Sequence, residues 1–332
     1  MFINWTHYLI PKLFFILSYI ANPVFVYLIS TENKFPFGDY KYLLYFFASF
    51  NMLSSLVDVL VPIGVFTYKY ATVVFLADGF FEKRSLLGDF MVPARIAFIA
   101  GTYGVLNSHF VYRFLSLRYN WIIVQYFNPY GLILAFYWVL FHWAFWEVVN
   151  FHAFASVPEM RGYVKEAFEE NFGVNIDSVN MKMAVFEGVS PELIRRSWKG
   201  TICETVLAGY SISLYLFLGY KIMSGLNKGF VTMSNKTLQI QRRLFWALAI
   251  QTFIPVCVSF APCAITLYGS AFSLDFLSPL NWVSSVAIST FSFLDPLAIM
   301  LCLPPLRDRL FFMVGIDLSK VLHTQVHSIT SF

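Results

Sequence analysis

Charged side chains are scarce in this sequence. Only 13% of its 332 residues are Asp, Glu, Lys or Arg, whereas soluble domains average about 25%. Hydrophobic residues make up 58% and aromatic residues 20%, and the mean hydropathy is +0.65. A soluble fold of this size could not bury so much apolar surface, so we expect lipid to be the solvent of most of the chain.

Cysteine is also scarce, and its positions exclude several kinds of site. The four cysteines are Cys203, Cys257, Cys263 and Cys302. Cys257 and Cys263 are six residues apart in one apolar stretch, so they cannot bridge each other within a helix. The sequence has no cysteine spacing typical of a metal site. We expect these residues to act as small apolar packing groups.

Catalytic constellations are missing as well. The sequence has no nucleophile with a nearby base, no phosphate-binding loop and no carboxylate pair at catalytic spacing. His109 and His142 fall in different apolar stretches, without carboxylates at metal-ligand spacing. The sequence therefore predicts no enzyme, no cofactor and no metal site, and we expect no nucleic-acid partner.

Long apolar stretches are what the chain does have. A helix needs about 20 apolar residues to cross the hydrocarbon layer, which is roughly 30 Å thick. Seven stretches meet this need: Tyr8–Ser30, Tyr42–Phe66, Met91–Leu117, Pro129–Val149, Thr201–Tyr220, Leu244–Tyr268 and Leu280–Leu303. Their runs lack the period-two alternation of barrel strands, so we predict an all-α bundle of seven transmembrane helices. No basic leader precedes the first stretch, which we expect to be retained as a helix.

Basic residues indicate the orientation, because short cytoplasmic loops are enriched in Lys and Arg. An odd number of spans places the two termini on opposite sides. With the N-terminus outside, the inner segments hold twelve basic residues, against four in the short outer segments. The inner residues are Lys34, Lys41, Arg113, Arg118, Lys221, Lys228, Lys236, Arg242, Arg243, Arg307, Arg309 and Lys320. We therefore predict an outer N-terminus and a cytoplasmic C-terminus, in one domain covering residues 1–332.

Three segments outside the spans carry further predictions. Residues 150–200 form the only sizeable loop, which we predict to be extracellular, with either a lid or packing role or a role in direct ligand contact. Residues 304–332 form a cytoplasmic tail that opens with a short interfacial helix. The N-terminal tail carries a glycosylation sequon at Asn4, and a second sequon at Asn235 lies on the inner side in this topology.

Ionisable residues inside spanning helices are costly and so point to function. Asp58 lies sixteen residues from the inner end of the second stretch, about 24 Å along a helix. Arg95 lies one turn inside the outer end of the third stretch. The two could pair across neighbouring helices; alternatively, Arg95 extends to the outer surface and Asp58 faces a watery cavity.

Other polar groups fall within the stretches. Glu147 and Glu204 lie near outer helix ends, where facing water is the simpler interpretation. Tyr103, Asn107, Gln251 and Asn281 fit either a pocket wall or hydrogen bonds between helices. Pro255 and Pro262 should bend the sixth helix.

Several motifs in order carry a resemblance to a known family. They are Asp39-Tyr40-Lys41-Tyr42-Leu43, His109-Phe110-Val111-Tyr112-Arg113-Phe114, the run from Gln241 to Pro255 with Ala261-Pro262, Phe293-Leu294-Asp295-Pro296-Leu297, and Arg307-Asp308-Arg309. From Asn22 to about Phe312 the chain resembles the nematode serpentine chemoreceptors of the Str class. The resemblance implies a G-protein-coupled receptor in sensory cilia that binds small odorants or soluble cues.

The resemblance also implies signalling roles for particular residues. Tyr112-Arg113 occupies the place of the Asp-Arg-Tyr switch of rhodopsin-like receptors, and Asp295-Pro296 the place of their Asn-Pro motif. No acid precedes Arg113, so the usual ionic restraint cannot form locally. No cysteine lies near the outer end of the third stretch, so the disulfide that commonly ties this end to the outer loop cannot form.

We expect a ligand cavity in the outer half, between the third, fifth, sixth and seventh helices. Its predicted wall residues are Asp58, Arg95, Tyr103, Glu204, Gln251 and Trp282. The predicted residues for signalling to a heterotrimeric G protein are His109, Tyr112, Arg113, Arg242, Arg243, Asp295 and Pro296. Arg242 and Arg243 can also anchor the inner end of the sixth helix at anionic lipid headgroups. An odorant-gated channel with inverted topology and a transporter remain alternatives, although no internal repeat favours the latter.

Overall fold

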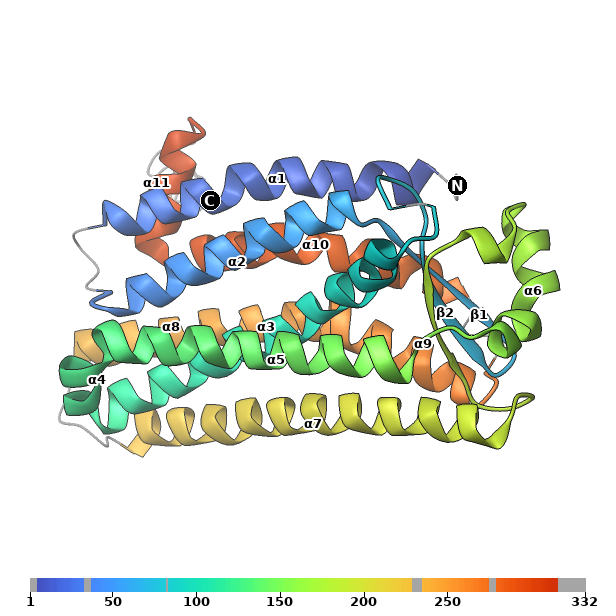
Figure 1. The fold of residues 1–332 in the computed structure, drawn as a ribbon. Helices are drawn as coiled ribbons and strands as arrows, with labels where there is room; N and C mark the ends of the chain where they lie inside the picture. The colour runs from blue at the N-terminus through green and yellow to red at the C-terminus, as the bar shows by residue number, and fades with distance from the viewer. Residues whose placement is uncertain (1–4, 33–36, 82, 229–234, 275–278, 316–332) are drawn as a thin grey trace, which may run out of the picture.

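The computed structural model describes residues 5–32, 37–81, 83–228, 235–274 and 279–315. Long helices run side by side along most of the molecule (Figure 1). Their bounds are α1 (Trp5–Ser30), α2 (Tyr40–Leu60), α3 (Leu86–Arg118), α4 (Asn120–Tyr126), η1 (Phe127–Gly131), α5 (Leu132–Ala153), α7 (Pro191–Lys228), α8 (Asn235–Pro255), η3 (Val256–Phe260), α9 (Ala261–Ala271) and α10 (Pro279–Cys302). The helical bundle expected from the sequence is confirmed.

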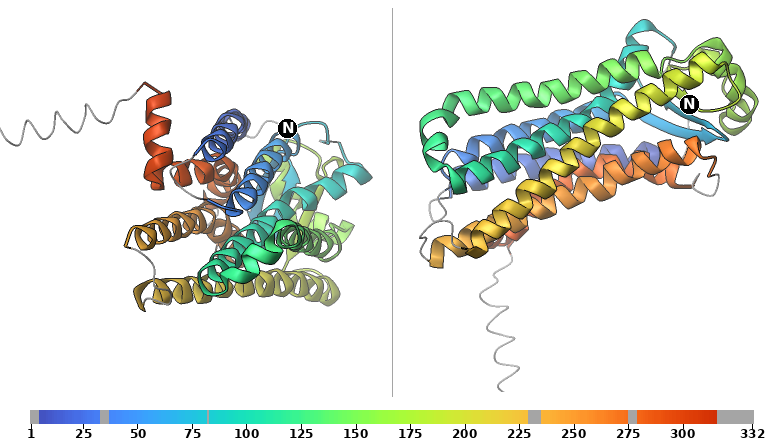
Figure 2. Two further views of the ribbon diagram at one scale, coloured as in Figure 1. Left: turned by 90° about the vertical axis from the view of Figure 1, so that its left-hand side faces the viewer. Right: turned by 90° about the horizontal axis from the view of Figure 1, so that it is seen from below.

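Six candidate spans in the described part of the chain are long and apolar enough to cross a membrane. One combines α4, η1 and α5, and another combines α8, η3 and α9. The seventh candidate is α10, which is followed by α11 (Pro304–Met313) after a bend of 109°. Figure 2 shows α11 directed away from the bundle. Pro304 and Pro305 stand at the start of α11, where a proline needs no hydrogen-bond donor.

A three-stranded antiparallel sheet caps one end of the bundle. Its order is β1 (Ile63–Tyr68), β2 (Ala71–Leu76) and β3 (Met181–Val185). In the register, Ile63 lies opposite Leu76 and Ala71 lies opposite Val185. The N-terminal end of α1 lies at this end of the molecule, and α11 lies at the other (Figure 1). We call the two ends the sheet end and the tail end.

The sequence prediction for the second stretch was wrong in its last part. We expected a helix through Phe66, but α2 ends at Leu60 and residues 63–66 belong to β1. The N–H of Val61 still bonds to the carbonyl of Val57 at 2.8 Å, and Pro62 follows. Because proline has no N–H and disfavours helical geometry in the residue before it, the chain leaves the helix here.

The sheet has a small hydrophobic core of its own with α6 (Pro158–Phe172). Met160, Val164 and Phe168 of this helix are fully buried against Phe75 and Met181 of the strands. The helix starts at a proline and is followed by Gly173, whose φ of 64° is left-handed and therefore suits glycine. This layer converts the long loop into an ordered cover over the sheet end.

The third span, α3, lies at the centre of the bundle and packs on α5 and α7. A Cβ on Gly104 would lie 2.8 Å from the Cα of Val139, so only glycine permits the observed approach of α3 to α5. Close approach through small residues is a common way for spanning helices to associate, because lipid provides no hydrophobic driving force between them.

Candidate functional site

A cavity of about 160 Å³ lies inside the bundle at its sheet end. Its side walls come from α3, α5, α7, η3, α9 and α10, and the three strands contribute the cover. The expected cavity between the third, fifth, sixth and seventh helices therefore exists. It also involves the fourth span and the sheet, which the sequence analysis did not include.

The cavity wall is mostly aliphatic and aromatic. Phe260, Trp146 and Ile99 are among its apolar members, and Tyr103 stacks on Phe260 with ring centroids 4.0 Å apart. Among its polar members are Asn150, Lys182, Glu204, Thr205 and Tyr268. An apolar pocket with a few polar groups is the usual design of a small-molecule site.

Two hydrogen bonds link helices across the polar part of the wall. The side-chain amide of Asn150 in α5 donates to Oε1 of Glu204 in α7 at 2.5 Å. The hydroxyls of Thr205 and Tyr268, in α7 and α9, lie 2.6 Å apart. Any ligand that binds between these groups would touch three helices at once.

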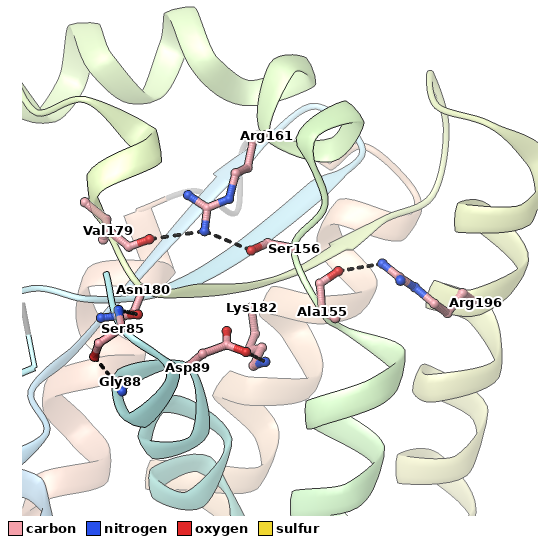
Figure 3. Close-up of polar contacts among 10 residues, drawn as sticks. All are labelled: Ser85, Gly88, Asp89, Ala155, Ser156, Arg161, Val179, Asn180, Lys182 and Arg196. Atoms are coloured by element: carbon pink, nitrogen blue, oxygen red, sulfur yellow. Dashed lines mark hydrogen bonds and ion pairs between the residues drawn. The ribbon is translucent and has the colours of Figure 1, made fainter. Parts of the chain in front are cut away.

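Lys182 brings a buried cation to the cavity from the sheet. Its ammonium lies 2.9 Å from the Asp89 carboxylate at the start of α3 and 4.5 Å from the centroid of the Phe151 ring. Figure 3 shows Lys182 and Asp89 directed toward each other beneath the strand. The positive charge of Lys182 is therefore balanced by the Asp89 carboxylate.

Asn180 ties the beginning of α3 to the strand that follows the long loop. Its side-chain oxygen accepts a hydrogen bond from the Ser85 N–H at 2.9 Å. Its amide donates to the carbonyls of Phe81 and Lys83, at 2.7 and 2.8 Å. A Cβ on Gly88 would lie 2.3 Å from the Asn180 amide nitrogen, so glycine is needed there (Figure 3). We call Asn180, Ser85, Gly88, Asp89 and Lys182 the polar clasp.

Two arginines, Arg161 and Arg196, bond to backbone carbonyls of the long loop that covers the sheet end. Arg161 of α6 donates to the Val179 carbonyl, and Arg196 of α7 donates to the Ala155 carbonyl (Figure 3). Arg161 also donates to the Ile176 carbonyl. Burial is the main influence on the pKa of Arg161 and lowers it from its ordinary value. These bonds satisfy loop carbonyls that would otherwise be buried without partners.

Asp58 and Arg95 form a direct ion pair between α2 and α3. Both side chains are almost completely buried, with 10% and 2% of their surface exposed. The pairing considered from the sequence is therefore present. Neither residue belongs to the cavity wall.

Gln251 and Asp295 meet in the middle of the bundle. The Gln251 amide donates to the Asp295 carboxylate at 3.4 Å, and the Asn51 amide donates to it at 3.3 Å. This contact links α8, α10 and α2, so Gln251 makes a bond between helices and does not line the cavity. Pro296 follows directly, within α10.

Arg113 lies buried near the tail end of α3. Its guanidinium donates to the Gln241 side-chain oxygen of α8 at 3.1 Å and lies over the Tyr40 ring, 4.5 Å from the centroid. Tyr40 also bonds to the His109 ring at 2.9 Å and stacks on Tyr112. The structure therefore brings His109, Tyr112 and Arg113 together with Tyr40 and Gln241. The last two belong to motifs of the family resemblance but were not among the predicted signalling residues.

Arg242 and Arg243 are exposed at the same end. Arg242 donates to the side-chain oxygen of Asn227 at 3.3 Å, which joins α8 to the end of α7.

Two predicted site residues, Asn4 and Trp282, have side chains that lie outside the described residues. Of the six predicted wall residues, Tyr103 and Glu204 line the cavity.

Asn150, Lys182, Thr205 and Tyr268 also line the cavity, and the sequence reasoning missed them in this role. Asn150 lies one turn after Glu147, just beyond the predicted end of the fourth stretch at Val149, whereas α5 continues to Ala153; a helix extended by one turn would have shown the two on one polar face. Lys182 lies in a loop of mixed charge, where no local pattern separates it from solvated neighbours. Its position depends on strand pairing with a distant segment.

Comparison with known proteins places the chain in a family. A family model described as "Serpentine type 7TM GPCR chemoreceptor Srj" matches residues 1–310. "Serpentine receptor class J-38" of Caenorhabditis elegans is 36% identical over 92% of this chain and 93% of the relative. "G-protein coupled receptor str-217" of the same organism is 25% identical, over 90% and 87%.

The fold also has a solved relative. Squid rhodopsin superposes with a TM-score of 0.57 at 11% identity, covering 94% of this chain and 85% of rhodopsin.

The expected Str class was wrong, since the matching family model is Srj and the Str relatives are more distant. The wider expectation of a nematode serpentine receptor, a receptor rather than an enzyme, is confirmed. With its seven-helix architecture and this match over nearly its whole length, the chain belongs to the Srj family of serpentine seven-transmembrane G-protein-coupled chemoreceptors.

Proposed function

We propose that this receptor detects a small odorant or soluble cue in its cavity and activates a heterotrimeric G protein at its tail end. The observation that carries the proposal is the separation of two sites in one bundle. A mostly apolar cavity lies at the sheet end, and the buried Arg113 contacts Gln241 at the tail end. Membership of a chemoreceptor family supports the same assignment.

The sixth span provides a physical connection between these sites. Phe260 of η3 and Tyr268 of α9 line the cavity, while Gln241 of α8 holds Arg113. Between them, Gln251 bonds to Asp295 of α10. A ligand that contacts one packing of this span better than another shifts the population toward that packing, and so changes the surroundings of Arg113, Arg242 and Arg243.

We place the receptor in the plasma membrane of chemosensory neurons, in the sensory cilium. In this placement the sheet end faces outside and the tail end faces the cytoplasm, as the distribution of basic residues predicts. The odorant-gated channel and the transporter are the alternatives. No specific observation on the described residues favours either, and the rhodopsin-like fold agrees better with a receptor.

The test is an Arg113→Ala variant in cells with a G-protein activation readout. Removing the guanidinium eliminates the bond to Gln241 and the contact with Tyr40. We expect ligand-dependent signalling to be abolished while surface expression is retained. An odorant panel on the parent receptor provides the activating compound.

Arg195→Ala is the matched control, because Arg195 is exposed at the start of α7, at the sheet end, whereas Arg113 lies near the tail end of α3. We expect this control to signal normally. Normal signalling by Arg113→Ala at equal surface expression would contradict the role assigned to Arg113.

A further inference from the structure

The charged groups near the cavity divide into paired and unpaired ones. Asp58 pairs with Arg95, and Lys182 pairs with Asp89. Each pair is neutral overall. Arg95 and Lys182 are therefore already compensated by carboxylates of the protein.

Two buried carboxylates in the same region have no cation at ion-pair distance among the described residues. Glu204 is 8% exposed and lines the cavity, and its described partner is the neutral Asn150 amide. Glu147 is 6% exposed, and both of its carboxylate oxygens lack a hydrogen-bond partner among the described residues. It lies one turn before Asn150 on α5, on the same side of that helix.

A carboxylate buried without a cation is unfavourable, because little solvent remains to stabilise its charge. An ammonium group in the cavity would supply the missing charge and donate hydrogen bonds to Glu204. A carboxylate ligand would instead bring a further negative charge close to Glu204. Its natural partner, Lys182, is already held by Asp89 at 2.9 Å.

The size and lining of the cavity limit the rest of the ligand. An engineered protein cavity of about 150 Å³ is large enough to hold benzene, and this cavity measures about 160 Å³. The stacked rings of Tyr103 and Phe260, with Trp146, offer aromatic surface to an apolar body. A compact hydrocarbon with one polar group fits both properties.

We propose that the ligand class of this receptor is small amines: an apolar body of about benzene size carrying one protonated nitrogen that binds the Glu204 carboxylate. This inference rests on the proposed function for the location of the ligand. It goes further by naming the charge of the ligand and the residue that recognises it. Asn150 orients the carboxylate, and Glu147 adds negative potential behind it.

The test compares carbon-matched probes on purified receptor and in cells. The first set is benzylamine, benzyl alcohol and benzoate; the second is cyclohexylamine, cyclohexanol and cyclohexanecarboxylate. Thermal shift of the purified receptor measures binding directly, and G-protein activation in cells measures signalling. We expect the amines to bind at least about tenfold more tightly than the matched alcohols, with no binding of the carboxylates, since a charge-assisted hydrogen bond has about this effect on affinity.

The decisive variant is Glu204→Gln, which keeps the shape and the bond to Asn150 but removes the charge. We expect amine affinity to fall about ten- to hundredfold, while any weak alcohol binding stays within about threefold. Glu192→Gln is the control, because Glu192 is exposed at the start of the same helix. Equal surface expression of both variants excludes a folding defect.

Binding and signalling separate the two proposals. Amine binding that depends on Glu204 but produces no G-protein response would keep this inference and contradict the proposed function. Preference for the carboxylates or alcohols, equal amine affinity in Glu204→Gln, or no binding of any amine would overturn the inference. In the first two cases G-protein activation would still support the receptor assignment.

Discussion

At the scale of single residues, buried charge is the main feature of this molecule. Arg95, Lys182 and Arg113 are all at most 5% exposed, yet each has an identified partner: Asp58, Asp89 and Gln241. A charge inside the bundle is tolerated only when another group stabilises it. Glu204, which lines the cavity, has only the neutral Asn150 amide as its hydrogen-bond partner among the described residues, and Glu147 has none.

The Asp58–Arg95 pair should be important for stability. In an Asp58→Asn variant, Arg95 remains buried without a carboxylate. Breaking a buried pair from one side costs about 3–5 kcal/mol, so we expect a clearly lower melting temperature of the detergent-solubilised receptor and reduced surface expression. Asp177→Asn, at an exposed site, should leave the melting temperature unchanged.

A second variant separates loss of the pair from general damage to the site. Asp58→Asn combined with Arg95→Met removes both charges, and replacing a whole buried pair by neutral groups is often tolerated. We expect the double variant to melt at a higher temperature than Asp58→Asn alone. A double variant that is less stable than the single one would contradict this account of the pair.

At the scale of elements, the polar clasp takes the place that a disulfide would hold. Asn180 lies next to β3 and bonds to three backbone groups of the segment that leads into α3. The ion pair of Lys182 with Asp89 adds a second link. Together they join the long loop to the start of α3 without any cysteine.

We expect Asn180→Ala to loosen this junction. The Ser85 N–H and the carbonyls of Phe81 and Lys83 would lose their partner, at about 1–3 kcal/mol for each group left buried and unpaired. Hydrogen–deuterium exchange should therefore increase in residues 83–89 and 178–183, while the middle of α3 remains protected.

Asn171→Ala is the matched control for the clasp. Asn171 is exposed and bonds within its own helix, to the Ala167 carbonyl, so its loss should leave exchange in both segments unchanged. Unchanged exchange in Asn180→Ala would contradict this role of Asn180 and show that strand pairing alone keeps the long loop in place at the sheet end.

At the scale of the whole molecule, the two ends of the bundle differ in construction. The sheet end is closed by strands and α6 (Figure 1). The tail end presents exposed arginines, among them Arg242 and Arg243. Among the short loops and helix ends, the basic residues concentrate at the tail end. This asymmetry fits a receptor that encloses its ligand on one side and presents a polar surface to a partner on the other.

The orientation of the bundle can be measured with terminal tags. We expect antibody to reach an N-terminal tag in intact cells and a C-terminal tag only after permeabilisation, because the predicted inner segments carry twelve basic residues and the short outer segments carry four. Permeabilised cells, in which both tags should be detected, are the control. Access to the C-terminal tag alone in intact cells would invert the topology and favour a ligand-gated channel.

The sequence by itself determined the seven-helix architecture, because the length and apolarity of each span are local properties set by the bilayer. It also identified Tyr103 and Glu204 as wall residues and Asp58 with Arg95 as possible partners, since a polar residue in an apolar stretch stands out. The family resemblance was right at the level of nematode serpentine receptors. Its class was wrong because motifs shared across related classes do not separate them.

Only the tertiary structure decided how the sheet end is built. The β1 strand was hidden inside an apolar stretch whose composition suits a helix as well as a strand, and β3 lay in a loop without a clear pattern. β3 pairs with β2, and this pairing joins residues more than a hundred positions apart. Lys182 reached the cavity through that pairing, and Asn150 met Glu204 through the packing of α5 on α7. Such contacts depend on which segments meet in space, which local hydrophobicity does not specify.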